Sequence, residues 1–313
     1  MIGKDIQYAC RLLKAGQLVA MPTETVYGLA GNALNPRAVA AIFAVKNRPS
    51  FDPLIIHLPD FPSFAPYIAT VRPELEALAR AFLPGPLTLL LEKSSLVPDL
   101  VTAGSPRVAI RVPAHPVARE LLGQLDFPLA APSANPFGYI SPTTARHVAD
   151  QLGAKIPYIL DGGPCTVGVE STILGFESGR PVIYRKGGLA IETIEKVVGE
   201  VAVKPYSSSN PQAPGMLKSH YAPSVPFFLA AALHRYPAGA VLIRFREYKP
   251  GWPEAQQHLL SPSGDYEEAA RRLFALMREL DGSGAPAIVA ELLPEEGLGR
   301  AVNDRLRRAA AQG

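Results

Sequence analysis

Cysteine is scarce in this sequence, which has only Cys10 and Cys165 among its 313 residues. Two cysteines provide neither a disulfide framework nor the ligand spacing of a metal site. A pairing of the two across the fold stays open, but reduced thiols, typical of the cytosol, are the expectation. The sequence therefore does not indicate a small domain held together by disulfides.

Long apolar runs are also missing. No segment approaches the roughly 18 consecutive apolar residues of a membrane-spanning helix. Residues 1–17 have an amphipathic helical pattern interrupted by Lys4, Asp5 and Arg11, unlike the continuous apolar core of a signal peptide. We therefore expect no membrane association and a cytoplasmic protein.

The charge is nearly balanced, with a formal net charge of +3. A nucleic-acid-binding protein usually concentrates Lys and Arg in a stripe, whereas the densest basic runs here are 271–272 and 305–308. Acidic residues 267–268 precede the first run at the spacing that favours ion pairs on an exposed helix face. This balance suits a small anionic substrate, which needs only a few well-placed cations.

Several enzyme signatures are absent. Residues 162–172, GGPCTVGVEST, are glycine-rich but have no lysine after the second glycine, so they do not form a Walker A loop. No GxGxxG follows a predicted strand, and neither HExxH nor GxSxG occurs. These absences argue against NAD-dependent enzymes, zincins and α/β-hydrolases.

What is present is an alternation of short apolar strands with helical stretches over residues 1–203, which favours an α/β domain with a mixed sheet. Helices are predicted after Asn35-Pro36 and after Ser141-Pro142, where an N-cap residue precedes a proline at the first helical position. The predicted strands are Leu18–Met21, Leu54–His57, Leu87–Leu91, Val108–Val112, Leu129–Ala131, Tyr158–Asp161, Ser171–Gly175 and Val182–Arg185.

The composition changes near residue 204. Residues 204–226 contain five prolines and three consecutive serines without periodicity, so we interpret 204–221 as a linker. The pattern beyond it predicts a smaller α/β domain over 222–313. Its predicted elements are the strands Phe227–Ala230, Ala240–Phe245 and Ala287–Ala290 and the helices Tyr266–Leu280 and Leu298–Ala310.

The segment 107–112, RVAIRV, is the most informative one for chemistry. On a strand, Val108, Ile110 and Val112 share one face and point into the core. Arg107 and Arg111 then flank a small alanine on the other face, where two guanidinium groups suit a carboxylate or a phosphate. An ordinary exposed strand face with two arginines is the alternative.

Other polar residues follow predicted strands and helices. Lys46 and Arg48 come at the end of the helix that begins after Asn35, and the pair is expected on an extended exit loop facing one site, with dipole compensation as the alternative. His57 ends a strand and is by itself more typical of a structural hydrogen-bonding role.

Two further segments place hydroxyl, carboxylate, phenol and amide groups directly after strands, where ligands bind in α/β proteins. They are residues 22–29, PTETVYGL, and residues 131–135, APSAN, with Ser133 and Asn135. Ser141 would head a helix whose first amides form a phosphate site, or it would act as a plain N-cap.

Taken together, the segments MPTETVYGLA, KNRPSFDPLIIH, LPGPLTLLLE, RVAIRVP, APSANPFGYISPT, GVESTI and VIYRKGG occur in this order over residues 20–188. The series closely resembles the YrdC-like family of threonylcarbamoyl-AMP synthases. APGMLKSHYAP and the ending GLGRAVNDRLRRAA are similar to its long, two-domain form. The resemblance implies a YrdC-like twisted mixed sheet with helices, and a smaller C-terminal Rossmann-like α/β domain joined by the linker.

The resemblance also implies site residues. Its threonine pocket corresponds to Thr25, His57, Arg111 and Ser171. Its ATP side corresponds to Lys46, Arg48, Arg107, Ala131, Ser133, Asn135, Ser141 and Arg185, to which we add Tyr221 of the linker. The chain departs from the family pattern at Asp52, where Asn is common, and at Phe137, where Ser is common.

The activity implied by the resemblance is a nucleotidyltransferase reaction that condenses L-threonine, bicarbonate and ATP to threonylcarbamoyl-AMP and pyrophosphate. Its product serves the t6A37 modification of tRNA, through downstream threonylcarbamoyl transferase proteins. No protein nucleophile is implied, because positioning and charge stabilisation suffice. Mg²⁺ is expected on the phosphates of ATP and not in a protein metal site.

Two alternatives remain at this stage. An RNA-binding module would interleave aromatic residues with the cations, and Tyr27 and Tyr184 are the main candidates; direct tRNA binding therefore stays open. Carbamoyl transfer within a larger maturation protein would require acylphosphatase-like or zinc-ligand segments, which the sequence lacks. The linker 204–221 is further expected to act as a lid that excludes water, with the alternative that His220 and Tyr221 anchor the second domain.

Overall fold

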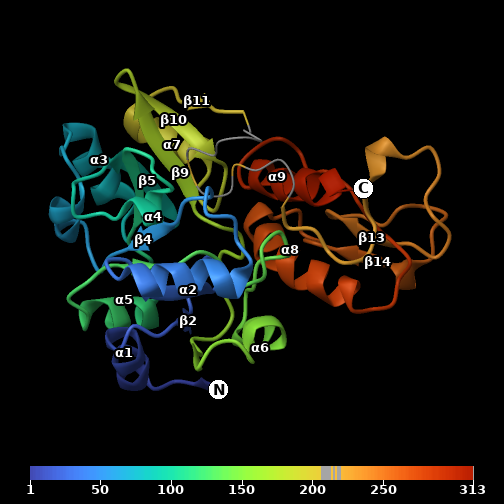
Figure 1. The fold of residues 1–313 in the computed structure, drawn as a ribbon. Helices are drawn as coiled ribbons and strands as arrows, with labels where there is room; N and C mark the ends of the chain where they lie inside the picture. Colours follow the sequence, from blue (N-terminus) through green and yellow to red (C-terminus); the bar gives the residue numbers. More distant parts are fainter. Residues whose placement is uncertain (206–212, 214–215, 217–219, 313) are drawn as a thin grey trace.

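The computed structural model describes residues 1–205, 213, 216 and 220–312. In this part of the chain, residues up to 203 form a mixed sheet of eleven strands in the order β1-β8-β2-β3-β7-β4-β6-β5-β9-β10-β11 (Figure 1). The strands are β1 Ile2–Gly3, β2 Val19–Met21, β3 Gly28–Asn32, β4 Ile55–His57, β5 Leu87–Glu92, β6 Arg107–Arg111, β7 Leu129–Ala130, β8 Tyr158–Leu160, β9 Thr172–Glu177, β10 Arg180–Arg185 and β11 Ala202–Val203. The predicted mixed α/β fold is confirmed.

Helices cover this sheet and bury its apolar side chains. They are α1 Ile6–Lys14, α2 Pro36–Lys46, η1 Pro62–Tyr67, α3 Pro73–Phe82, α4 Asp99–Thr102, α5 Pro116–Gly123, α6 Ala145–Leu152 and α7 Ile191–Val198. Ile42 of α2, Leu78 of α3 and Ile110 of β6 belong to one large apolar cluster. Burial of these side chains supplies the main driving force for folding this part of the chain.

Helix α2 begins at the residue that the sequence predicts. The Asn35 side chain accepts hydrogen bonds from the backbone amides of Arg37 and Ala38, and Pro36 occupies the first helical position. The helix expected after Ser141-Pro142 begins later, at Ala145, because Thr144 takes the N-cap role and accepts from the amide of His147. The prediction that Ser141 heads a helix is therefore wrong.

Strand β3 was not predicted. Its sequence, GLAGN, lacks the β-branched and aromatic residues that mark strands, and it pairs antiparallel with β2. The glycine at position 31 is explained by a lack of space, because a Cβ there would lie 2.8 Å from Leu18 Cδ2. The small residues that permit close packing thus remove the sequence signal of the strand.

The second part of the chain has its own sheet of four parallel strands, in the order β12-β15-β13-β14. Its elements are β12 Phe227–Leu229, η2 Ala230–Ala232, β13 Val241–Arg244, η3 Glu254–Gln256, β14 Gln257–Leu259, α8 Tyr266–Asp281, β15 Ile288–Ala290, α9 Gly299–Ala309 and η4 Ala310–Gln312. All five predicted elements are present, whereas η2, η3, β14 and η4 were not predicted. The domain boundaries at 203/204 and 221/222 stay a prediction.

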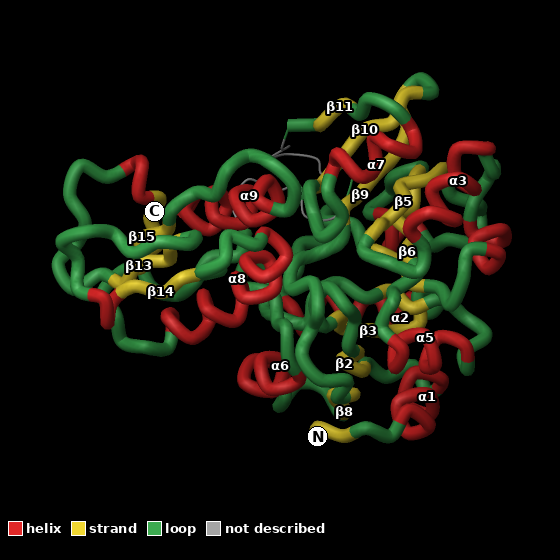
Figure 2. Tube along the Cα trace, turned by 180° about the vertical axis from the view of Figure 1, so that it is seen from behind, coloured by secondary structure: helices red, strands yellow, loops and turns green. Residues whose placement is uncertain are grey.

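Helices α8 and α9 lie between the small sheet and the first part of the chain in both views (Figures 1 and 2). Val26 and Val169 of the first part share an apolar cluster with Leu273 of α8 and Val302 of α9. The approach is close at Gly168, where a Cβ would lie 2.4 Å from the Cα of Arg271. The two parts are therefore packed together through apolar side chains.

Candidate functional site

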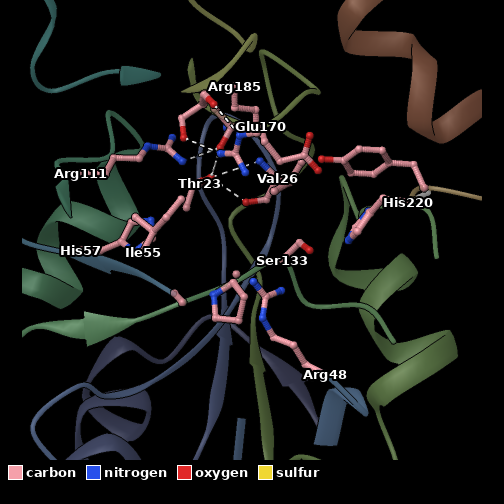
Figure 3. A pocket seen from close by; sticks show the side chains of 16 residues that line it. Thr23, Val26, Arg48, Ile55, His57, Arg111, Ser133, Glu170, Arg185 and His220 are labelled. Carbon is pink, nitrogen blue, oxygen red and sulfur yellow. Dashed lines mark hydrogen bonds between the residues drawn. The ribbon is translucent and has the colours of Figure 1, made fainter. Parts of the chain in front are cut away.

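A cavity that is partly open to solvent lies beside the central strands, and its empty space including the open part is about 580 Å³ (Figure 3). The loop after β2, the ends of β4, β6 and β10, and the segment before β9 all contribute to its wall. His220 and Tyr221, which come just before the second part of the chain, also line the cavity. The lining residues are Thr23, Thr25, Val26, Gly28, Arg48, Ile55, His57, Arg111, Ala131, Pro132, Ser133, Glu170, Ser171, Arg185, His220 and Tyr221.

Four of these residues belong to the predicted threonine pocket, and the sheet register explains why they meet. His57 of β4 lies opposite Arg111 of β6, which lies opposite Thr88 of β5. The Thr88 Oγ1 and Ser171 Oγ atoms are 2.7 Å apart and hydrogen-bonded. The structure thus brings Thr25, His57, Arg111 and Ser171 together at one wall of the cavity.

Arg111 is held by three groups. Its Nη1 donates to Thr25 Oγ1 at 2.7 Å, its Nη2 pairs with Glu24 Oε1 at 2.7 Å, and its Nε donates to the carbonyl of Gly85 at 3.3 Å. The guanidinium therefore has a fixed orientation before any ligand binds, which is the pre-organisation that carboxylate recognition requires.

His57 is neutral in this setting. It is 3% exposed, and burial together with the nearby Arg111 lowers its pKa to about 3. A neutral imidazole adds hydrogen-bonding capacity to the pocket without a second positive charge beside Arg111.

The loop that carries Ser171 is positioned from β10. Arg185 donates from Nε to the Ser171 carbonyl at 3.0 Å and from Nη2 to Ser171 Oγ at 3.1 Å. The backbone after β10 also presses on this loop, since a Cβ at Gly187 would lie 2.3 Å from the carbonyl carbon of Ser171. The first glycine of the YRKGG segment is therefore required by the close approach of two backbones.

Lys46 supports the opposite wall without lining the cavity. Its buried Nζ donates to the carbonyls of Ser133 and Asn135, each at 2.5 Å. Burial and the nearby Arg48 hold the pKa of Lys46 well below its usual value. The expectation of an extended exit loop is wrong for Lys46, because this residue completes α2. Ala131 and Ser133 line the cavity, whereas Asn135 holds the loop by donating to the carbonyls of Pro136 and Tyr139.

Arg48 does line the cavity, but it also has protein partners. It pairs with Asp52 at 2.9 Å and donates to the carbonyl of Pro53 at 2.8 Å. Its guanidinium carbon lies 5.9 Å from the centre of the Phe137 ring. Asp52 and Phe137, the two departures from the family pattern, thus both contact Arg48.

Of three other predicted ATP-side residues, only Tyr221 lines the cavity. Ser141 is buried and donates to Glu170 Oε1 at 2.5 Å without lining the cavity. Arg107 lies outside the lining and donates to the Tyr184 hydroxyl at 2.7 Å. Tyr221 lines the cavity, with a positive φ of 66°. Which of these residues bind ATP stays a prediction.

Sequence reasoning missed the buried charges around Tyr221. Arg305 and Arg308 of α9 have their guanidinium carbons 5.3 and 4.6 Å from the Tyr221 ring centre. The basic run 305–308 thus contributes two fully buried arginines, whereas Arg271 and Arg272 are exposed, as predicted. Glu170 was missed as well, whereas Glu24 is the carboxylate noted in residues 22–29, without its role in holding Arg111. The only signal for Glu170 was its place in the GVESTI segment.

Neither a membrane-spanning helix nor a cluster of metal ligands is found among the described residues. None of the helices in this part of the chain has the length and apolarity needed to cross a bilayer. Across the same residues, no group of three or more His, Cys, Asp or Glu is placed to hold a metal ion.

Comparison with known families covers nearly the whole chain. Residues 11–187 match the Sua5/YciO/YrdC family, described as "Telomere recombination", and residues 189–311 match "Threonylcarbamoyl-AMP synthase, C-terminal domain". The chain therefore belongs to the Sua5/YrdC family of threonylcarbamoyl-AMP synthases, in its two-domain form.

Individual relatives match the chain over nearly its whole length. The threonylcarbamoyl-AMP synthase of Pyrococcus abyssi is 42% identical, over 97% of this chain and 94% of the relative. That of Bacillus subtilis is 39% identical, over 98% and 93%. A crystal structure of P. abyssi Sua5 complexed with L-threonine superposes with a TM-score of 0.91 at 39% identity, covering 99% of this chain and 97% of the other.

Proposed function

We propose that this protein condenses L-threonine, bicarbonate and ATP into threonylcarbamoyl-AMP and pyrophosphate. The observation that carries the proposal is the convergence of Thr25, His57, Arg111 and Ser171 at one wall of the cavity. Family membership supports the same activity, and the solved relative from P. abyssi was crystallised with L-threonine.

Threonine is proposed to bind with its carboxylate on Arg111. This guanidinium is already oriented by Glu24 and Thr25, so little reorganisation is needed on binding. The hydroxyls of Thr25 and Ser171 are hydrogen-bonding partners for the polar groups of the amino acid, and Ile55 supplies an apolar contact for its methyl group.

The chemistry needs no protein nucleophile. The threonine amine adds to CO₂ derived from bicarbonate, which forms a carbamate and releases a proton. A carbamate oxygen then attacks the α-phosphorus of ATP, and pyrophosphate leaves. The cations Arg48 and Arg185 line the cavity and would stabilise the charge on the transferring group.

Mg²⁺ would enter with the nucleotide. The carboxylates beside the cavity, Glu24, Asp52 and Glu170, each pair with an arginine, so they do not form a ready cage for a divalent ion. Such a site fits a metal that is held mainly by substrate phosphates and reduces their negative charge.

The product is an activated carbamoyl group, suited to transfer onto the N6 amine of an adenosine in tRNA by a separate transferase. We propose this role in t6A37 synthesis, and a cytoplasmic location with it. The chain itself is not proposed to perform the transfer.

The test is incubation with ATP, Mg²⁺, bicarbonate and threonine, followed by mass spectrometry for threonylcarbamoyl-AMP and an assay for pyrophosphate. Reactions without threonine or without bicarbonate are the controls. Serine should react less well, since one methyl group is worth about 1–3 kcal/mol. Pyrophosphate release that is independent of threonine would contradict the proposal. Equal rates with limiting serine and threonine would contradict the specificity.

A further inference from the structure

Arg305 is a fully buried arginine that reaches from α9 to the wall of the ligand cavity. It is 0% exposed, and its Nε and Nη2 lie 3.0 and 2.9 Å from Glu170 Oε2. Its Nη1 donates to the carbonyl of Lys186 at 2.6 Å and pairs with Asp304 at 2.8 Å. One side chain of the C-terminal part thus joins the loops before β9 and after β10.

Glu170 is the cavity-lining end of this contact. One of its oxygens accepts from Ser141 and the other meets Arg305, so the carboxylate is fixed on both sides. Burial alone would raise the pKa of Glu170, but Arg305 and then Arg185 outweigh it, and the pKa is lowered. The group is therefore an anion in the wall of the cavity.

An uncompensated anion in this wall would weaken the binding of negatively charged ligands by electrostatic repulsion. The other two carboxylates near the cavity, Glu24 and Asp52, pair with arginines of the first part of the chain, Arg111 and Arg48. The ion-pair partner of Glu170 comes from α9 instead. Without it, the charge of Glu170 would be less fully offset, by Arg185 and the Ser141 hydroxyl, and the wall next to Ser171 would repel phosphate or carboxylate more strongly.

We propose that Arg305 is a positioning residue for nucleotide binding, which holds the Glu170 carboxylate in place and neutralises its charge so that the cavity accepts the phosphates of ATP. The proposal rests on the proposed function. It gives the C-terminal part of the chain a direct electrostatic role in the site, through a residue that does not line the cavity.

The test measures ATP binding by calorimetry on the full chain. Arg305→Gln should weaken ATP binding about tenfold or more, because it leaves a buried carboxylate without its cation. The double variant E170Q/R305Q should recover most of that loss, since the Glu170 carboxylate is removed together with its cation, while Asp304 keeps its ion pair with Arg308 at 3.6 Å. Arg307→Gln is the matched control on the same helix, because Arg307 pairs with Glu295 at the surface, and it should bind ATP as the unaltered chain does.

A purely structural role for Arg305 would give a different pattern. The double variant would then bind ATP no better than R305Q, and this result overturns the proposal, as does unchanged binding by R305Q. If R305Q does not fold, the proposal is overturned by a double variant E170Q/R305Q that folds but does not bind ATP. It is also overturned if Arg305→Lys, which keeps the charge, lowers ATP affinity a hundredfold. An unaltered chain that binds ATP but forms no threonylcarbamoyl-AMP contradicts the proposed function, while the binding comparison still decides the role of Arg305.

Discussion

Arg111 forms a buried ion pair with Glu24, with 2.7 Å between Nη2 and Oε1. The pair presents the guanidinium at a fixed angle on the cavity wall, because Thr25 and Gly85 hold its other nitrogens. The threonine affinity of the site should therefore depend on the planar fork of Arg111 and not on its charge alone.

Replacing Arg111 with lysine tests this dependence. Arg111→Lys keeps the charge but cannot make the three contacts together, and we expect threonine binding to weaken by about 2 kcal/mol or more. Calorimetric titration of threonine and of ATP measures both effects. Arg107→Lys, on the same face of β6, is the matched control and should change threonine affinity by less than about twofold. Equal losses of threonine affinity in the two variants would contradict the assignment.

Lys46 should matter for both stability and nucleotide binding. Lys46→Met removes the donor for the carbonyls of Ser133 and Asn135, and each unsatisfied buried carbonyl costs about 1–3 kcal/mol. We expect a lower unfolding temperature and weaker ATP binding, because the 133–135 loop loses its support. Lys14→Met at an exposed site of α1 should change neither. A variant with full stability and full ATP affinity would show that the loop is held by other contacts.

Asp52 should limit ATP affinity. Asp52→Asn preserves the shape of the side chain but removes the negative charge that offsets Arg48 at 2.9 Å. We expect ATP to bind about fivefold more tightly. The variant should also be less stable by about 1–3 kcal/mol, since the buried Arg48 loses its ion pair with Asp52. Asp126→Asn, an exposed carboxylate, serves as the control. If D52N binds ATP more weakly than the unaltered chain, Asp52 contributes to the site in another way.

His57 should make the fold sensitive to acid. Its pKa is about 3 in the folded chain and about 6.5 when unfolded, so protons bind the unfolded state preferentially between these values. Stability that is present above pH ~6.5 is therefore lost as the pH falls toward 3, by up to about 1.4 kcal/mol per pH unit. Unfolding measured at pH 7, 6 and 5 should show a shallower loss in His57→Gln. Other buried histidines are common to both proteins and cancel in the difference. Parallel curves for the two proteins would contradict the assigned pKa shift.

The parts of the fold that the sequence predicted are those with a local physical signal. Alternation in RVAIRV predicts which side chains of β6 enter the core, and Val108, Ile110 and Val112 lie in the main apolar cluster. Asn35-Pro36 predicts the start of α2. Local signals fail where a competing cap is close by, as at Thr144, or where small residues hide a strand, as in β3.

The site was only partly predictable for a related reason. Arg111 was indicated by the alternation in RVAIRV and Ser171 by the family segment that contains it, whereas their partners come from distant parts of the chain. Glu170 and Arg305 are 135 positions apart, and no periodicity connects them. Burial of Arg305 is decided by the packing of α9 against the first part of the chain, which the basic run at 305–308 does not indicate.

The short strand β4 has a consequence for how reliably the molecule reaches its native state. Ile55 and Ile56 are both buried, in different apolar clusters, so the two faces of the strand are similar in hydrophobicity. A slip of one position against β6 would exchange the faces at little apolar cost, yet it would turn His57 away from Arg111. Molecules in the shifted register would therefore be compact but would lack the arrangement of polar groups that we assign to ligand recognition.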